Sequence, residues 1–459
     1  MVPVATRSGS RIAVIGLGAS GLATAQALAA GGADVLAWDD DARARDRAAE
    51  AGVATAAVDD ADWARIAALV LAPGIPLTHP APHRTVALAA AAGRPVIGDI
   101  ELLAEACPEA TFVGITGTNG KSTTTSLIGH ILAAADRRPQ VGGNLGRPAL
   151  SLAPLGRGGV YVLELSSYQL DLMQDARMDV AVLLNVTPDH LDRHGDMAGY
   201  VAAKLRIFRD RADGRPQTAA VSVDDPYCAE IAGALAKAGH WRVVPISVMR
   251  ATDGVHVSDG VLFDGGARVC DLRGIATLPG SHNWQNAAAA YAAAKAVGLS
   301  TAQIVAGLAT YPGLAHRQEL VATIGGVRYV NDSKATNADA ASRAVACYDP
   351  IYWIAGGKAK TDELDLVAPH FGHVRHAFLV GAATEVFARI LDGTVPYTRS
   401  GDVARALADA HAMAQAEQLP GAVVLLSPAC ASFDQWKSFE ERGDAFRAMV
   451  QKLAAEAPR

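Results

Sequence analysis

A glycine-rich segment between residues 114 and 123 has the residue types needed to bind the phosphates of a nucleotide. It contains Gly117, Gly120 and the pair Lys121-Ser122, between an apolar run and a stretch typical of a helix. Glycines let backbone N–H groups approach phosphate oxygens, and the N-terminus of a helix favours negative charge. Lys121 is expected to reach the β- and γ-phosphates, while Ser122 or Thr123 supplies a hydroxyl to magnesium. The segment therefore predicts an ATP-binding loop.

The spacing of this loop departs from the usual eight-residue rule. That rule places a glycine five residues before Gly120, where the chain has Ile115, and the nearest upstream glycine is Gly114. A glycine turn that only joins a strand to a helix is the alternative interpretation. The strand–loop–helix context favours the phosphate loop, and the departure indicates a variant family rather than an ordinary GTPase or ATPase.

A second glycine turn lies near the N-terminus. Gly16-x-Gly18-x-x-Gly21, with Asp39 and Asp40 about 20 residues further on, fits the dinucleotide-binding pattern. The motif by itself favours a nicotinamide enzyme. Because a phosphate loop follows in the next part of the chain, the turn can instead serve a different nucleotide, such as a UDP-linked substrate. A purely structural turn is the third interpretation.

Composition and charge exclude several classes of protein. The chain has 459 residues, half of them apolar and 5% aromatic, and a net charge of −6. This charge provides no broad positive field for nucleic acid or an anionic membrane. The five cysteines are scattered, which favours neither a zinc site nor a disulfide framework, and no apolar run is long enough to span a bilayer. We expect a soluble cytoplasmic protein.

The positions of apolar runs and glycine turns predict an α/β fold in three successive units. Strands are expected at 11–15, 34–38, 111–115, 159–164, 180–185, 351–355, 377–380 and 422–426, with helical segments between them. The range 69–76 is expected to be a strand that runs into a turn at a sheet edge. The second unit starts after residue 99, and a proline–glycine break near residue 312 suggests the start of the third. We predict domains at 1–99, 100–313 and 314–459. The first and third are expected to be Rossmann-like and the second to resemble P-loop ATPases.

Ordered motifs along the whole chain resemble those of the Mur ligase family. The resemblance rests on Gly114-Ile-Thr-Gly-Thr-Asn-Gly-Lys-Ser-Thr123, Gly142-Gly-Asn144, Glu164-Leu-Ser-Ser167, Asn185-Val-Thr-Pro-Asp-His190, Ala203-Lys204, His282-Asn283-x-x-Asn286, His316-Arg317, Asn331-Asp-Ser-Lys-Ala-Thr-Asn337 and Leu426-Ser-Pro-Ala-Cys-Ala-Ser-Phe433. The N-terminal glycine turn, the run 332–337 and Ser432-Phe433 resemble the member of the family that adds D-glutamate.

The resemblance implies an ATP-dependent ligase of cytoplasmic peptidoglycan precursor synthesis. Its small-molecule substrates are expected to be UDP-N-acetylmuramoyl-L-alanine and D-glutamate, joined through an acyl phosphate with release of ADP and phosphate. Two magnesium ions are implied as cofactors with ATP, and a monomer is expected. Domain closure is expected to be required because Arg317 and Asp332 follow the proposed hinge.

The resemblance also assigns roles to single residues. It implies Lys121, Lys204, His190 and Arg317 as catalytic residues, and Ser122, Glu164, His190 and Lys204 as metal ligands, with Lys204 converted to a carbamate. The implied ATP-binding residues are Gly117, Thr118, Asn119, Gly120, Lys121, Ser122, Thr123, Asn283, Asn286, Arg317 and Asp332. From residue type alone, Glu164 and His190 can be ordinary solvated residues, Lys204 a surface charge, and the two asparagines a helix cap.

Two further sets are implied for the other substrates. For the UDP-linked substrate these are Ser20, Asp39, Asp40, Gly74, Asn144 and His190, and for D-glutamate Lys334, Thr336, Lys360, Ser432, Phe433 and Phe439. Asp40 stands where the resemblance leads us to expect threonine, and Lys358 is an alternative to Lys360.

Several other functions compete with this interpretation. A nicotinamide oxidoreductase leaves the phosphate loop and the C-terminal part without a role. Folylpolyglutamate synthase and the ligases that add alanine or a diamino acid are closer alternatives, against which the first glycine turn and the run 332–337 argue. A non-catalytic nucleotide-binding module is the last alternative, and the presence of Lys121 and Arg317 argues against it.

Overall fold

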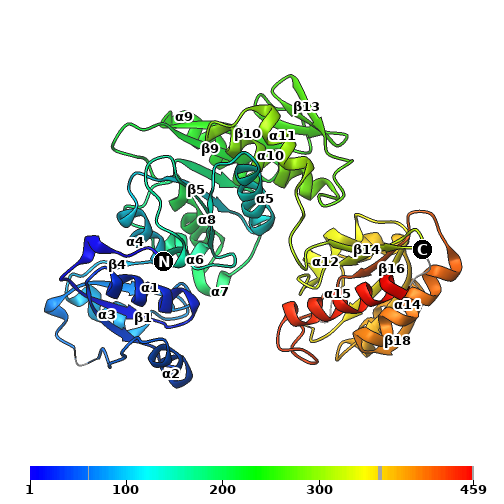
Figure 1. Cartoon of the computed structure of the whole chain (residues 1–459), viewed down its shortest axis with the longest axis horizontal. Helices are drawn as coiled ribbons and strands as arrows, with labels where there is room; N and C mark the ends of the chain where they lie inside the picture. The colour runs from blue at the N-terminus through cyan, green and yellow to red at the C-terminus, as the bar shows by residue number, and fades with distance from the viewer. Residues whose placement is uncertain (60, 360–363, 457–459) are drawn as a thin grey trace. The chain divides into compact units, whose positions relative to one another are not determined.

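The computed structural model describes residues 1–59, 61–359 and 364–456. The chain forms three separate β-sheets with helices between the strands, so the predicted α/β class is confirmed (Figure 1). The chain forms two compact units. The first comprises 1–272 and 283–311, and the second comprises 273–282 and 312–459. The predicted domain boundaries after residues 99 and 313 stay predictions.

The first sheet is parallel and has the strand order β2-β1-β3-β4. Its strands are β1 Arg11–Ile15, β2 Asp34–Trp38, β3 Ile66–Leu71 and β4 Val96–Ile97, and its helices are η1 Ala5–Arg7, α1 Ala19–Ala30, α2 Ala42–Glu50, η2 Trp63–Arg65 and α3 Arg84–Ala91. Alternate residues of β1 enter opposite cores, because successive side chains of a strand point to opposite faces. Ile12 and Val14 pack in one apolar cluster, and Ala13 and Ile15 in the other.

The second sheet has nine strands in the order β13-β12-β11-β10-β9-β8-β5-β7-β6. The strands from β6 to β11 are parallel, and β12 and β13 add an antiparallel edge. The strands are β5 Thr111–Thr116, β6 Gln140–Gly143, β7 Val160–Glu164, β8 Val180–Leu183, β9 Gln217–Ser222, β10 Trp241–Ser247, β11 Val255–Ser258, β12 Val261–Asp264 and β13 Ala267–Asp271.

Helices cover this sheet and connect it to the first. They are α4 Asp99–Ala106, α5 Lys121–Ala134, η3 Ala149–Ser151, α6 Ser167–Asp171, α7 Leu191–His194, α8 Met197–Leu205, η4 Arg206–Phe208, α9 Pro226–Ala238, α10 Ser281–Ala296 and α11 Thr301–Ala309. One apolar cluster runs from β1 and α1 through α4 to β7, which joins the first two sheets within one compact unit. None of the described helices is long and apolar enough to cross a membrane.

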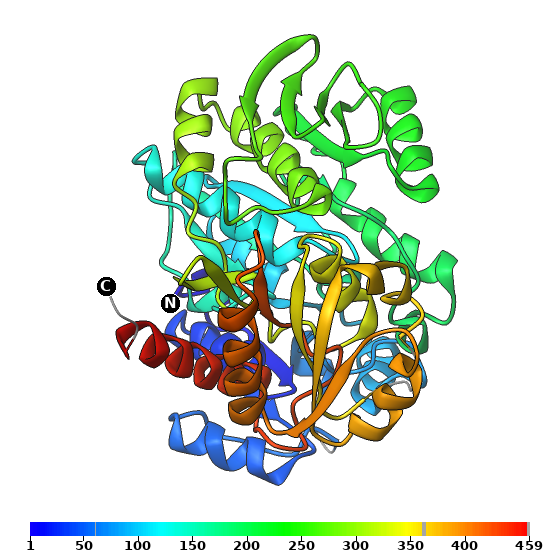
Figure 2. The same ribbon diagram turned by 90° about the vertical axis from the view of Figure 1, so that its right-hand side faces the viewer.

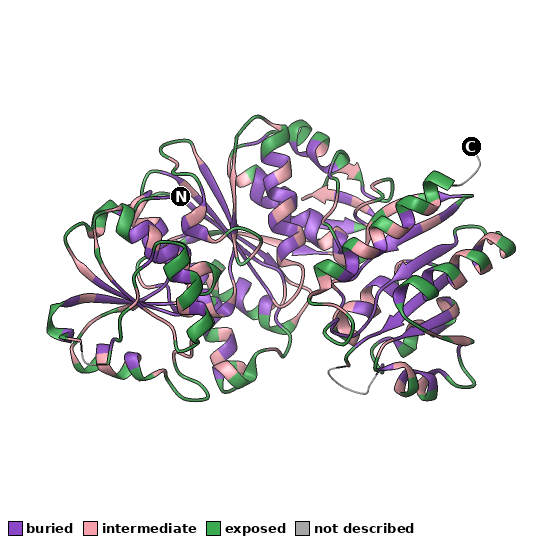
Figure 3. Cartoon of the chain, turned by 60° about the horizontal axis from the view of Figure 1, so that its bottom comes forward, coloured by how far each residue is buried: buried purple, intermediate pink, exposed green. Residues whose placement is uncertain are grey.

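The third sheet, in the second unit, has the order β14-β15-β19-β16-β17-β18, and only β14 runs antiparallel to its neighbour (Figure 2). Trp353 of β16 packs in one apolar cluster and Tyr352 in the other, so both faces of the sheet are covered. Figure 3 shows buried strands and exposed outer surfaces on the helices. The elements are β14 Glu319–Ile324, β15 Val327–Asn331, α12 Ala338–Val345, β16 Ile351–Gly356, η5 Ala368–His373, β17 Val374–Val380, α13 Thr384–Leu391, β18 Tyr397–Gly401, α14 Val403–Glu417, β19 Val423–Leu426 and α15 Phe439–Glu456.

Candidate functional site

The register of the second sheet brings the predicted phosphate loop and Glu164, one of the predicted metal ligands, to the carboxyl ends of neighbouring strands. Ile115 of β5 pairs with Glu164 of β7, and Thr116 pairs with Leu183 of β8. The residues that follow these strands therefore leave the sheet side by side at its carboxyl end. Ligands of parallel α/β sheets bind at this end of the strands.

The loop between β5 and α5 has the geometry of a phosphate-binding loop. Gly117 and Gly120 have φ values of +151° and +86°, which side chains with a Cβ rarely adopt. Gly120 is the N-cap of α5, so the first N–H groups of the helix face the loop. The Lys121 ammonium donates to the carbonyl oxygens of Gly117 and Thr118, at 2.8 and 2.9 Å. The Lys121 side chain thus lies across the phosphate loop, where its predicted role requires it.

Asn286 of α10 packs beneath this loop. Its Oδ1 accepts a hydrogen bond from Thr124 at 3.2 Å, and a Cβ added to Gly120 would lie 2.4 Å from the same oxygen. Its Nδ2 donates to Oδ1 of Asn283, one helical turn earlier, at 3.2 Å. Both asparagines are buried. Their predicted contact with adenine stays a prediction, and the structure adds a direct role for Asn286 in supporting the loop.

Glu164 carries a buried carboxylate that the protein satisfies only in part. The residue is 3% exposed, and its Oε1 accepts a hydrogen bond from Nδ2 of Asn144 at 2.7 Å. Its Oε2 is buried and has no hydrogen-bond partner within the described chain. A buried charge without a partner is costly, so this oxygen suits a cation. A hard oxygen donor at a phosphate loop fits magnesium, which takes few protein ligands and completes its shell with water and phosphate oxygens.

The described residues contain no group of three or more histidine, cysteine, aspartate and glutamate side chains that could hold a metal ion. A metal at Glu164 therefore needs donors of other kinds, such as the hydroxyl of the buried Ser122.

His190 precedes the short helix α7 and adopts a left-handed backbone conformation, with φ of +54°. Its Nδ1 shares a hydrogen bond of 2.8 Å with the hydroxyl of Tyr168, and its Nε2 lies 3.4 Å from Oδ2 of Asp189. Burial lowers the pKa of His190, and the Asp189 carboxylate opposes this effect. The ring is thus held mainly through Nδ1. The lowered pKa favours the neutral imidazole, which is the form that can act as a metal ligand.

Lys204 lies on α8 and is 1% exposed, unlike an ordinary helix lysine. Its ammonium lies 4.5 Å from the centre of the Tyr200 ring. Burial, reinforced by the charge of Lys121, lowers the pKa of Lys204 to about 7. A neutral amine is the form that reacts with carbon dioxide, so this environment favours the chemistry implied for Lys204.

Tyr200 is a site residue that the sequence analysis missed. Its hydroxyl lies 3.1 Å from Oγ1 of Thr118, so it connects α8 with the phosphate loop. The available signal was its spacing: Tyr200 precedes Lys204 by four residues and therefore lies on the same helix face.

Three residues predicted for the UDP-linked substrate already form hydrogen bonds to other residues of the first compact unit. Asp39 accepts hydrogen bonds from the backbone N–H groups of Leu17, in the glycine turn, and Asp41. Asp40 accepts two hydrogen bonds from Arg84, which hold the pKa of its carboxyl well below the usual range. The Ser20 hydroxyl donates to Oδ2 of the buried Asp99 at 2.6 Å.

The predicted D-glutamate residues lie in the second unit, apart from Lys360, which is outside the described residues. The Lys334 ammonium lies 3.8 Å from the centre of the Phe439 ring. Ser432 is buried, whereas Phe433 is 69% exposed. Thr336 donates its backbone N–H to the carbonyl of Lys334 at 2.8 Å. Residues from two loops and α15 are therefore available, and their contact with the amino acid stays a prediction.

The predicted ATP residues of this unit lie near the same loops. Asp332 directly follows β15 and is buried. Its carboxylate accepts hydrogen bonds from the Ser427 hydroxyl and the Gln318 backbone. Burial raises its pKa to about 7, which the Ser427 bond and the charge of Arg317 oppose.

Arg442 of α15 is a second residue that the sequence analysis missed. It is 2% exposed, and it donates to Oγ and the carbonyl of Ser333 and to the carbonyl of Cys430. It therefore joins the loop that carries Lys334 to the loop that carries Ser432. The signal was its position on the buried helix face of Phe446 and Val450, where an apolar residue is normal.

Comparisons with known proteins agree on one family. A family model described as Mur ligase middle domain matches residues 115–294, and one described as Mur ligase, glutamate ligase domain, matches residues 316–430. The UDP-N-acetylmuramoylalanine–D-glutamate ligase of Paramagnetospirillum magneticum is 53% identical over 457 residues, which cover 98% of each chain. The ligase of the same name from Phenylobacterium zucineum is 52% identical over 465 residues, covering 99% of this chain and 98% of that protein.

Solved structures share the fold at low sequence identity. UDP-N-acetylmuramate–alanine ligase from Thermotoga maritima has a TM-score of 0.57 and 15% identity, covering 96% of this chain and 99% of that one. A pseudomurein peptide ligase type C from Methanothermus fervidus has a TM-score of 0.54 and 17% identity, covering 97% and 100%. These two likenesses concern the fold alone.

Proposed function

The chain belongs to the Mur ligase family, and we propose that it joins D-glutamate to UDP-N-acetylmuramoyl-L-alanine, with ATP converted to ADP and phosphate. The reaction forms an amide bond from a carboxylate and an amine in the synthesis of peptidoglycan precursors. The unpartnered Oε2 of Glu164, buried at the same sheet edge as the phosphate loop, carries the proposal within the structure. We propose that this oxygen binds a cation, which an ATP-dependent activation of a carboxylate needs.

The first step activates the carboxylate of the UDP-linked substrate. A carboxylate is a poor electrophile, so one of its oxygens attacks the γ-phosphorus of ATP and ADP leaves, which produces an acyl phosphate. Both reactants are anions. Lys121 and the backbone N–H groups at the start of α5 reduce their repulsion, and Arg317 is proposed to bind the γ-phosphate.

In the second step, the amine of D-glutamate attacks the carbonyl carbon. The bond to the phosphate oxygen breaks, and phosphate leaves with the oxygen that came from the carboxylate. The amine must lose a proton before or during the attack. Lys334, Thr336, Ser432, Phe433 and Phe439, with Lys360 or Lys358, are proposed to bind the amino acid, because its two carboxylates require cations and hydroxyls.

Magnesium, used with ATP in this family, neutralises charge on the phosphates and on the attacking carboxylate. Ser122, Glu164, His190 and a carbamate on Lys204 are proposed to hold two ions. The pKa of about 7 for Lys204 supports the carbamate, because much of the amine is then neutral near physiological pH.

The remaining assignments complete the proposal. Ser20, Asp39, Asp40, Gly74, Asn144 and His190 are proposed to bind the UDP-linked substrate, and the three predicted domains to contribute one reactant site each. The chain is proposed to act as a monomer in the cytoplasm, with domain closure as part of catalysis.

Phosphate release with UDP-N-acetylmuramoyl-L-alanine, ATP, magnesium and a panel of amino acids tests the function. We expect release with D-glutamate and at most a few per cent of that rate with L-glutamate, L-alanine or a diamino acid. Release with one of those amino acids but not with D-glutamate would overturn the assignment.

A further inference from the structure

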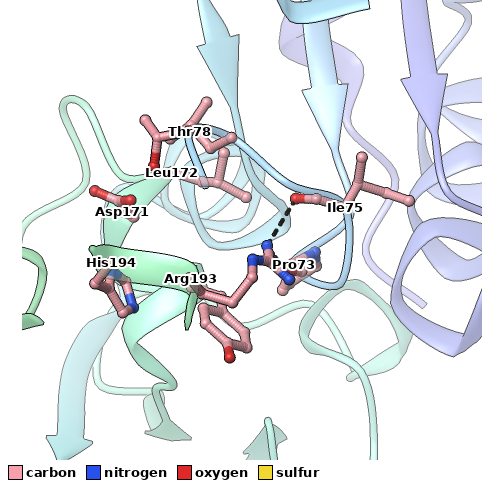
Figure 4. A pocket seen from close by; sticks show the side chains of 9 residues that line it. Pro73, Ile75, Thr78, Asp171, Leu172, Arg193 and His194 are labelled. Carbon is pink, nitrogen blue, oxygen red and sulfur yellow. Dashed lines mark hydrogen bonds between the residues drawn. The ribbon is translucent and has the colours of Figure 1, made fainter. Parts of the chain in front are cut away.

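Arg193 of α7 binds the backbone of the loop that follows β3. Its Nη1 donates to the carbonyl of Gly74 at 3.0 Å, and its Nη2 donates to the carbonyl of Ile75 at 3.1 Å and lies 3.5 Å from that of Pro73. Figure 4 shows the side chain extending from the helix to this loop, with a dashed line to Ile75. One guanidinium therefore binds three consecutive carbonyl groups that lie outside the strand and accept no hydrogen bond from a neighbouring strand of the described chain.

The same side chain packs on the residue that holds His190. The Arg193 guanidinium lies 4.5 Å from the centre of the Tyr168 ring, and the hydroxyl of that ring shares the 2.8 Å hydrogen bond with Nδ1 of His190. Tyr168, Arg193 and His194 line one small pocket together with Pro73 and Ile75 of the loop. Arg193 thus contacts both the loop that follows β3 and Tyr168, the residue that holds His190.

On its other side, the loop rests on the N-terminal glycine turn. A Cβ added to Gly16 would lie 2.7 Å from Cγ1 of Ile75 and 2.8 Å from Cβ of Ala72. Gly16 has φ of +88°, so the turn is tight and the loop fills the space that a side chain would occupy. A shift of Ile75 would therefore change the surface beside this turn.

We propose that Arg193 is a positioning residue that fixes the 72–75 loop, and with it the N-terminal glycine turn, at a set distance from His190. The identity of the ligand rests on the proposed function: the UDP-linked substrate would have to contact Gly74 in this loop and His190 beyond it. Arginine suits this role because its planar fork has several donors in fixed directions, whereas the ammonium of lysine is a single point charge.

The variant Arg193→Lys tests the proposal because it keeps the charge and most of the stem. Calorimetric titration with UDP-N-acetylmuramoyl-L-alanine should give a Kd at least tenfold higher than for the unchanged protein. The KM for this substrate should rise equally, while the KM values for ATP and D-glutamate stay within twofold. Hydrogen exchange at the backbone amides of residues 72–79 should accelerate, while the midpoint of thermal unfolding stays within about two degrees. Arg157→Lys, in an exposed ion pair with Glu109, is the matched control and should change none of these values.

Two results would overturn the proposal: an unchanged Kd and KM for the UDP-linked substrate, or equal increases in KM for all three substrates, which indicate a general structural role. Failure of the proposed function looks different. The unchanged protein would then release no phosphate with D-glutamate, and the exchange rates of residues 72–79 in Arg193→Lys would still decide whether Arg193 holds the loop.

Discussion

At the scale of single residues, Glu164 combines burial with a carboxylate oxygen that has no partner in the described chain. The variant Glu164→Gln keeps the shape and the acceptor for Asn144 but removes the charge. We expect kcat to fall at least 100-fold, because the magnesium site loses its carboxylate. Without magnesium, the midpoint of thermal unfolding should rise by a few degrees, because a buried charge is removed.

Differential scanning fluorimetry with and without magnesium and nucleotide checks the second half of this prediction. The unchanged protein should be stabilised by magnesium with nucleotide, and Glu164→Gln should lose most of that stabilisation. A variant that is less stable without magnesium, or that retains full activity, would show that Glu164 serves the fold rather than a cation.

Lys204 permits a test of its proposed carbamate. Lys204→Ala should lose most of the activity, because the metal loses a carboxylate-like ligand, and small carboxylic acids such as acetate or propionate should restore part of it. The measurement is phosphate release against the concentration of added acid. Chloride at the same ionic strength is the control, and the idea fails if activity survives the substitution or if chloride restores it as well.

Sequence motifs could identify residues proposed to bind ligands, but not the residues that hold those residues in place. Glu164 and Lys204 stand in motifs of the family resemblance, so they could be named before the fold was known. Arg193 and Arg442 were missed because an arginine in a helix is normally a solvated charge, and only the apolar face of α15 gave a signal for Arg442. Their carbonyl partners Ile75 and Ser333 lie far away in the chain, and no local pattern records such contacts.

At the scale of elements, the phosphate loop depends on the conformation of Gly120. Gly120→Ala requires a side chain at φ of +86° and places its Cβ 2.4 Å from Asn286. We expect the Kd for ATP to rise at least tenfold, as measured by equilibrium binding. Gly156→Ala is the matched control, because nothing lies within 4 Å of the added Cβ there. An unchanged Kd in Gly120→Ala would contradict the assigned geometry of the loop.

Strands were the elements that could be predicted best. The expected strands 11–15 and 34–38 agree with β1 and β2 to the residue, because buried parallel strands are continuous apolar runs between turn residues. The strands β4, β6, β9 to β15 and β18 were not predicted. Strands β11, β12 and β13 show one reason. They carry exposed or half-buried residues such as Ser258 and Arg268, so their apolar pattern is weak.

The segment 273–282 belongs to the second unit, although the helix that it enters continues in the first. His282 in this segment has its pKa lowered by burial to about 4. Between pH 6.5 and 4 the unfolded chain therefore binds a proton at this residue that the folded chain does not. Stability from this group is present above pH 6.5 and is lost as the pH falls toward 4.

The variant His282→Gln should flatten this dependence. Its midpoint of thermal unfolding, measured from pH 7 to 4, should fall by a few degrees less than that of the unchanged protein. Parallel curves for the two proteins would show that His282 is not protected from protonation in the folded state.

At the scale of the whole molecule, the residues proposed for ATP fall in both compact units. Lys121 and Asn286 belong to the first unit, and Arg317 and Asp332 to the second. Three sheets could be predicted because the pattern of apolar runs and turns starts again at the beginning of each predicted domain. That the first two sheets share one compact unit could not, since it depends on an apolar cluster that includes Ile12, Leu102 and Tyr161.

The central claim is that the chain activates a carboxylate as an acyl phosphate and transfers it to D-glutamate. The most direct test uses UDP-N-acetylmuramoyl-L-alanine with both carboxylate oxygens replaced by oxygen-18, together with ATP, magnesium and D-glutamate. Mass spectrometry should find a product that contains glutamate and has lost one labelled oxygen, and phosphate that has gained it. A product with unlabelled phosphate, or no product that depends on D-glutamate, would contradict the claim.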